Sequence, residues 1–190
     1  MARHPAPAPQ ELAAAIRAAV GRLLERLPGG ILQVNDGHCG DVAEAAVRAV
    51  GIRESARYRI VDTVDFCIFG DPETCRFDAR TLRRRWPRSR PPAPLTWRGL
   101  NALGLQDCGH VWLVLDGRHH DADVPDGVDS IFDLPLFRRN LASLVLARRA
   151  PLASRLAGDP WWAESFALHA DLQAWADTHD LEPAGTKSMR

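Results

Sequence analysis

The chain has 190 residues, 46% of them hydrophobic and 25% charged, which is the composition of a globular protein with one substantial core and excludes a disordered or fibrous one. Lysine plus arginine and aspartate plus glutamate are both 24, so the net charge of zero gives no field that would attract nucleic acid or an anionic membrane. The sequence has neither the apolar core of a secretory signal nor a run of about 18 apolar residues, and we expect a soluble, cytoplasmic protein.

Two helices are predicted near the start of the chain. Apolar residues recur at helical spacing from Pro9 to Leu27, and Pro28-Gly29-Gly30 ends this pattern. The turn sequence Asn35-Asp36-Gly37 then precedes a predicted helix from about Cys39 to Val50, which ends before Gly51. Cys39 is therefore expected at a helix N-terminus.

Strands and a long loop are predicted in the middle of the chain. The segment from Tyr58 to Phe69 is rich in β-branched and aromatic residues, which favours one or two strands. Arginine and proline are frequent from Arg80 to Pro94, and this pattern predicts an exposed, irregular segment. The arginines of this region, which extend to Arg98, could alternatively dock an anion or a protein partner.

A β-hairpin is predicted around Asp116-Gly117, because this dipeptide lies between two strand-like runs and favours a type I′ turn. Counting outwards from a two-residue loop puts His110 opposite Asp123 and diagonally from Asp121. Both acids share the face of His110, so the register leaves two candidate partners for the imidazole.

Two more helices are predicted after the hairpin. They run from about Pro135 to Arg149 and from Pro160 to His179, and Asp159 is placed to cap the second. We expect residues 1–8 to be a flexible leader and residues 182–190 a flexible tail. The sequence therefore predicts a single α+β domain of the catalytic type over residues 9–181.

Cysteine chemistry is the main functional signal. The chain has four cysteines, which are expected to be reduced without a secretory signal: Cys39, Cys67, Cys75 and Cys108. A helix N-terminus lowers the pKa of a thiol, and Cys39 is the one so placed. A nucleophilic thiol also needs an imidazole to share its proton and an acid to orient the imidazole, which His110 and the hairpin acids supply. The alternative is a buried, structural cysteine.

The residues around Cys39 and His110 resemble the papain-like superfamily, which includes the transglutaminase-like proteins. The segment Gln33-Val-Asn-Asp-Gly-His-Cys39-Gly40 is similar to the papain motif, in which a glutamine six residues before a helix-capping cysteine helps to form the oxyanion hole. His110-Val-Trp112 with the following Asp-Gly turn and Asp121 resembles the transglutaminase-like hairpin, where an aspartate lies diagonally from the histidine. The resemblance covers about half of the chain and implies that Asp121 orients His110. Gly40 departs from it, since an aromatic residue usually follows the cysteine.

Taken together, these residues predict a thiol-dependent hydrolase or acyltransferase that acts on an amide of a protein or peptide, either a peptide bond, an isopeptide bond or a glutamine side chain. Cys39 is expected to be the nucleophile, His110 its base, Asp121 the orienting acid and Gln33 an oxyanion donor, with Asp123 as the alternative acid. No cofactor is required. The alternative function is a non-catalytic protein-binding module on the same scaffold.

Three further expectations concern the surroundings of this site. His38 is expected to be a turn residue, and His119 is expected to be structural. Zinc binding is not predicted, because the cysteine and histidine spacings do not fit the common structural sites. Finally, we expect the hairpin face that carries His110 and Trp112 to be turned toward the helix that begins at Cys39, with Gln33 bordering the same cleft.

Overall fold

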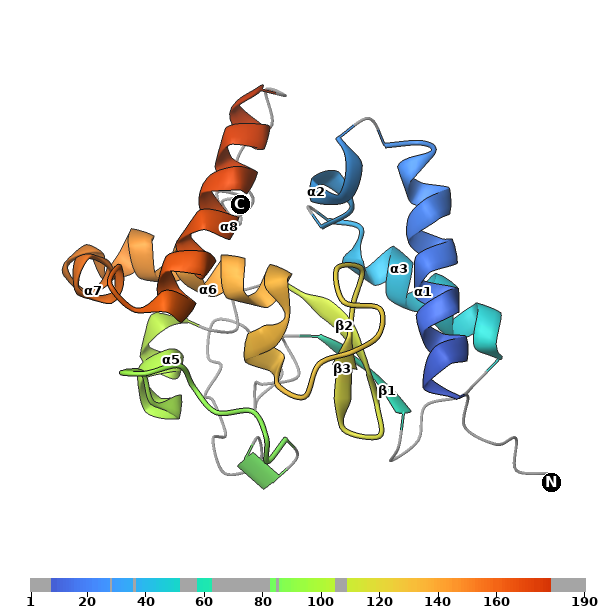
Figure 1. Cartoon of the computed structure of the whole chain (residues 1–190), viewed down its shortest axis with the longest axis horizontal. Helices are drawn as coiled ribbons and strands as arrows, with labels where there is room; N and C mark the ends of the chain where they lie inside the picture. Colours follow the sequence, from blue (N-terminus) through green and yellow to red (C-terminus); the bar gives the residue numbers. More distant parts are fainter. Residues whose placement is uncertain are drawn as a thin grey trace, which may run out of the picture.

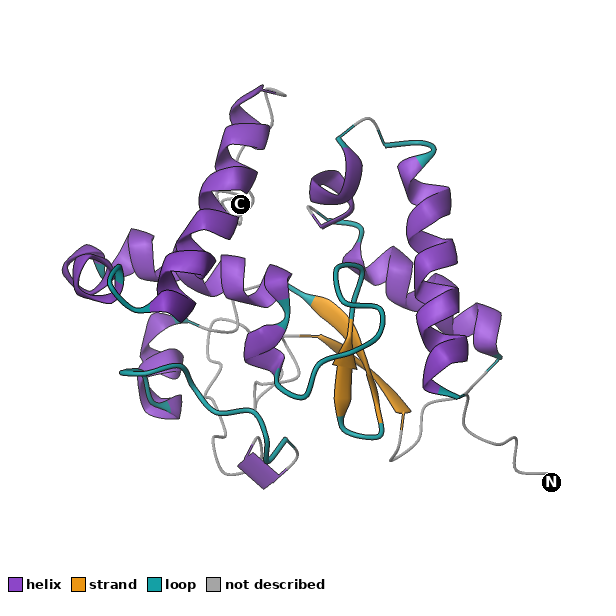
Figure 2. Ribbon diagram, in the orientation of Figure 1, coloured by secondary structure: helices purple, strands orange, loops and turns teal. Residues whose placement is uncertain are grey.

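The computed structural model describes residues 8–27, 29–35, 37–51, 58–62, 83–84, 86–104 and 109–178. In this part of the chain seven α-helices accompany one three-stranded antiparallel sheet, so the predicted α+β class is confirmed. The sheet lies between two groups of helices, with α1 to α3 on one side and α5 to α8 on the other (Figures 1 and 2). Both chain ends, the predicted strand region beyond residue 62 and the cysteines other than Cys39 lie outside the described residues.

The first group consists of α1 (Pro9–Leu24), α2 (Gly30–Asn35) and α3 (Cys39–Val50). Helices α1 and α3 agree with the two predicted helices, and α3 ends where Gly51 adopts the left-handed backbone conformation, with φ of 67°. The short helix α2 was not predicted. The two longer helices pack on each other and on one face of the sheet through a shared core: Leu12, Ala15, Ile16, Ala19, Val42, Ala43, Ala46, Leu113 and Leu115.

The sheet is formed by β1 (Tyr58–Asp62), β2 (Val111–Leu115) and β3 (Arg118–His120), with β2 in the centre. Leu115 pairs with Arg118 across the hairpin. Asp116 and Gly117 both have positive φ, 50° and 79°, as a type I′ turn requires. The predicted hairpin is therefore confirmed.

Strand β2 is buried on both faces, because each face packs against a different group of helices. Leu113 and Leu115 belong to the core with α1 and α3, whereas Trp112 and Val114 belong to the core with the C-terminal helices. The expectation that the face carrying Trp112 is turned toward α3 is therefore wrong. An apolar run with no polar face cannot indicate which face meets which helix.

The second group consists of α5 (Trp97–Leu103), α6 (Pro135–Arg148), α7 (Ala150–Leu156) and α8 (Pro160–Thr178), with a 3₁₀ turn, η3 (Ile131–Asp133), before α6. Helices α6 and α8 agree with the predicted helices, whereas α5 and α7 were not predicted. None of the helices in the described ranges has the length and apolar character needed to cross a bilayer.

Helices α6 and α8 are held together by polar contacts as well as by the core. Asp159 Oδ1 caps α8 by accepting hydrogen bonds from the backbone N–H groups of Trp161 and Trp162, at 3.0 and 3.3 Å. The buried Arg138 of α6 donates to Ser165 Oγ at 3.1 Å and to the backbone carbonyl of Trp161 at 2.8 Å. The guanidinium is therefore buried with hydrogen-bond partners from α8.

Most described residues of the arginine- and proline-rich segment are exposed, as predicted, but Trp86 and Ser89 are buried. Trp86 is buried in the core that β2 shares with the C-terminal helices, which we call the second core. The centroid of its ring lies 6.0 Å from that of Trp112. Ser89 is also buried, and its Oγ accepts a hydrogen bond from the backbone N–H of Ile131 at 3.1 Å. The composition of the segment does not indicate that these two residues are buried, because most of the side chains around them are arginine or proline.

His119 is a buried, uncharged histidine in the middle of this core. Its Nδ1 accepts a hydrogen bond from Trp112 Nε1–H at 3.0 Å, and its ring meets the Trp86 ring edge-on at 5.5 Å. Burial, with a smaller effect from the neighbouring His120, lowers the pKa of His119 to about 3. The expected structural role of His119 fits these contacts.

We predict that His119→Asn weakens the dependence of stability on pH. An unfolded chain gains a proton on this residue below about pH 6.5, whereas the folded protein gains it only near pH 3. Each pH unit between these values therefore costs the wild type about 1.4 kcal/mol of unfolding free energy. Asparagine keeps a hydrogen-bond acceptor for Trp112 but does not titrate. Urea unfolding between pH 7 and pH 4 should give a flatter curve for the variant, and equal slopes would contradict the assignment.

Candidate active site

Cys39 is the first residue of α3 and is partly buried. The His110 imidazole and the backbone N–H groups of Val111 and Gly40 lie near its sulfur. The sulfur therefore lies where the start of α3 meets the start of β2. The structure brings Cys39 and His110 together, as expected from the sequence.

The environment of Cys39 favours the thiolate. Burial by itself raises the pKa of the thiol, but the nearby His110 imidazole, together with the two backbone N–H groups, more than offsets it. The pKa of Cys39 is consequently lowered from its ordinary value of 9.0. A lowered thiol pKa is typical of reactive cysteines and not of buried structural ones.

His110 lies immediately before β2 and is fully buried. Its ring stacks on Trp112, with centroids 5.4 Å apart, and its Nε2 lies 3.1 Å from Asp121 Oδ2. Burial lowers the pKa of His110, but Asp121 and Cys39 outweigh this and raise it to about 9. Asp121 and Cys39 thus favour the charged imidazole, just as His110 favours the thiolate.

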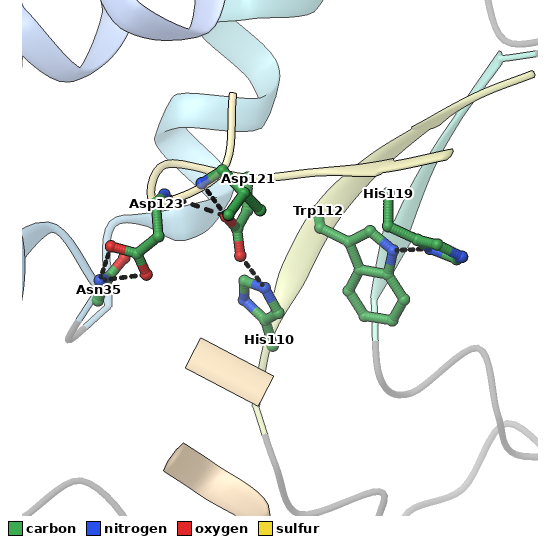
Figure 3. Close-up of polar contacts among 7 residues, drawn as sticks. Asn35, His110, Trp112, His119, Asp121 and Asp123 are labelled. Atoms are coloured by element: carbon green, nitrogen blue, oxygen red, sulfur yellow. Dashed lines mark hydrogen bonds and ion pairs between the residues drawn. The ribbon is translucent and has the colours of Figure 1, made fainter. Parts of the chain in front are cut away.

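Asp121 is held so that one carboxylate oxygen faces His110. Its Oδ1 accepts hydrogen bonds from the backbone N–H groups of Asp123 and Val124, at 3.0 and 2.9 Å, which leaves Oδ2 for the imidazole. Figure 3 shows the Asp121 carboxylate directed at His110, whereas the Asp123 carboxylate is directed at Asn35. Of the two acids that the hairpin register left open, Asp121 thus makes the contact with the imidazole.

The structure does not bring the expected oxyanion donor into contact with the thiol. Gln33 Oε1 accepts a hydrogen bond from the backbone N–H of Gly29 at 2.9 Å, within the start of α2. Its Nε2 is the donor end that remains, and no hydrogen bond joins Gln33 to Cys39 in the described part of the chain. His38 lies just before α3 and its Nδ1 is 2.7 Å from Asp41 Oδ2, which agrees with a turn residue.

Two residues near the thiol were missed in the sequence. Val111 contributes a backbone N–H to the sulfur, and backbone donors carry no signal in residue type. The Asn35 side chain donates hydrogen bonds to Asp123. In the sequence Asn35 indicates only a turn, since Asn-Asp-Gly is a common turn sequence. Both roles depend on which segments meet in the folded structure, and the sequence alone does not show this.

Other candidate sites lie away from Cys39. Across the ranges that the structure describes, no group of three or more histidine, cysteine, aspartate or glutamate side chains could hold a metal ion. A cavity of about 280 Å³ is lined by Arg88 and Arg90 with Asp133, Asp159 and Trp161, and its lining contains neither Cys39 nor His110. The arginine-rich segment thus lines a separate cavity.

Models of known protein families, characterised proteins and experimentally solved structures were all compared with the chain, and none matches it significantly.

We predict that the rate at which iodoacetamide alkylates Cys39 rises with pH with a midpoint below 9.0, because only the thiolate reacts and its pKa is lowered. His110→Gln removes the imidazolium and leaves burial to dominate, so the rise should move to higher pH. Peptide mapping distinguishes Cys39 from the other cysteines, and thermal unfolding checks that the variant is folded. A wild-type midpoint at or above pH 9.0 would contradict the lowered thiol pKa.

We also predict that Asp121→Asn slows alkylation of Cys39 at pH 7 more than Asp123→Asn does. Asp121 contacts the imidazolium directly at 3.1 Å, so its loss should lower the pKa of His110 and return the proton to sulfur, by roughly tenfold in thiolate population per pKa unit. Asp126→Asn is a matched control, because Asp126 is an exposed acid of the same loop. The reverse order would transfer the orienting role to Asp123.

Proposed function

We propose that the protein is a thiol-dependent hydrolase or acyltransferase that cleaves an amide of a protein or peptide. The supporting observation is that the Cys39 sulfur lies near His110, whose Nε2 lies 3.1 Å from Asp121 Oδ2. In this proposal Cys39 is the nucleophile, His110 moves the proton and Asp121 orients the imidazole. The same residue types, in the same chain order, underlie the resemblance to papain-like and transglutaminase-like proteins, which we propose as the fold family.

Acylation begins from the Cys39 thiolate and the His110 imidazolium. The Cys39 thiolate attacks the amide carbonyl carbon, and a carbon–sulfur bond forms while the carbonyl oxygen takes up negative charge. The His110 imidazolium then gives its proton to the amide nitrogen as the carbon–nitrogen bond breaks. An amine, or ammonia from a glutamine side chain, leaves, and a thioester on Cys39 and a neutral imidazole remain.

Deacylation reverses the direction of proton transfer. His110, now neutral, takes a proton from a water molecule or from an acceptor amine as that nucleophile attacks the thioester. The carbon–sulfur bond breaks and the electron pair returns to Cys39, so that the thiolate–imidazolium pair is restored. Water gives a carboxylic acid and amounts to hydrolysis or deamidation, whereas an amine gives a new amide and amounts to acyl transfer.

The negative oxygen that forms in both steps needs hydrogen-bond donors. The backbone N–H of Cys39, at the N-terminus of α3, and the Gln33 Nε2 amide are the donors that we propose. Gln33 would have to direct its amide to the space beside the sulfur when substrate is bound. Loss of one such donor typically costs roughly a hundredfold or more in kcat.

We predict that Cys39→Ser abolishes covalent labelling by a peptide-based electrophile without changing the fold, because the thiolate and not the side-chain volume performs the reaction. The matched control replaces Cys67, Cys75 and Cys108 by serine and leaves Cys39 as the only thiol. Intact-mass spectrometry should find one adduct on the control and none on Cys39→Ser. Undiminished labelling of Cys39→Ser would remove the proposed role and favour a non-catalytic binding module.

A further inference from the structure

A buried bridge joins two segments of the site that are 88 positions apart in sequence. Asn35 is the last residue of α2, and its Nδ2 donates hydrogen bonds to both carboxylate oxygens of Asp123, at 3.1 and 2.9 Å (Figure 3). Asn35 is buried and Asp123 is partly buried, so water replaces these hydrogen bonds poorly. The bridge links the segment that leads into Cys39 to the loop that follows β3.

This bridge closes a ring of contacts around the site. The chain runs from Asn35 to Cys39 in four positions, and the Cys39 sulfur lies near His110. His110 contacts Asp121 Oδ2, and Asp121 Oδ1 accepts a hydrogen bond from the backbone N–H of Asp123. The Asp123 side chain then returns to Asn35. Each of the three reactive side chains therefore lies on a closed path whose last link is the Asn35 amide.

We infer that Asn35 is a positioning residue, which fixes the loop that directs Asp121 at His110 and anchors the same loop to the segment before Cys39. The inference deepens the proposed function and rests on it for the role of the thiol. Without the amide, the Asp123 carboxylate loses both side-chain hydrogen bonds, and the loop can shift to bring the carboxylate to water. Such a shift withdraws Asp121 from the imidazole.

The charges around Asp123 show why an amide suits position 35. Burial raises the pKa of Asp123, and the charge of Asp121 adds to this effect. The hydrogen bonds from Asn35 oppose it, as do the charges of Arg139 and His110. A carboxylate at position 35 would face Asp123 as a like charge, whereas the neutral amide offers only donors to it.

The test measures the pH dependence of Cys39 alkylation by iodoacetamide in the wild type, Asn35→Ala, Asn35→Asp and the swapped double variant Asn35→Asp with Asp123→Asn. Asn35→Ala should react about 3- to 10-fold more slowly at pH 7, because a looser Asp121 lets the thiol pKa rise by part of a unit to one unit. Asn35→Asp should react more slowly still. The swap restores one amide and one carboxylate, and its rate should return to within about twofold of the wild type.

Asp126→Asn is the matched control. Asp126 lies in the same loop and pairs with Arg17 of α1, but this pair is exposed, and its loss should leave the alkylation profile unchanged. A rate for Asn35→Ala equal to that of the wild type would overturn the inference, and so would a swapped variant no faster than Asn35→Asp. If Asn35→Ala does not fold, the comparison of Asn35→Asp with the swap still decides. A wild type without a lowered thiol pKa would instead refute the proposed function.

Discussion

The close approach of Cys39 to His110 is the contact on which the proposed site depends. Burial opposes both charges, and it is offset by their mutual attraction, by the Asp121 carboxylate and by backbone N–H donors to the sulfur. A buried pair of this kind adds little to stability, since desolvation consumes most of the Coulomb energy. Perturbed pKa values of this kind cluster at functional sites, which supports the proposed function.

The layered architecture explains how two remote segments meet at this pair. Helix α3 packs on one face of β2 through Leu113 and Leu115, which sets its N-terminus at the beginning of the strand. The other face of β2 places Trp112 in the second core, and the His110 ring stacks on Trp112. Each partner is thus fixed by a different core, and the central strand connects the two.

The sequence predicted those parts of the fold that have strong local signals. Helix α8 has its capping Asp159, and the hairpin has a dipeptide that accepts positive φ at both positions. The choice between Asp121 and Asp123 needed more than register, and the backbone N–H donors that fix the Asp121 carboxylate have no sequence signal. The short helix α2 and the faces of β2 were missed because their patterns of apolar residues allow several structures. The hydrogen bond from the Gly29 N–H to Gln33 Oε1 could not be predicted either, since it depends on how α2 is oriented.

The ultraviolet absorbance of the thiolate tests the charge pair most directly. A pH titration of the wild type, with Cys39→Ser subtracted, reports the ionisation of this one thiol without any reagent. We predict a transition centred below pH 9.0, in which the thiolate is lost as pH falls through the lowered pKa of Cys39. In the same titration, His110→Gln should shift the transition to higher pH. A wild-type transition centred at pH 9 or above, unchanged in His110→Gln, would contradict the pair and with it the proposed chemistry.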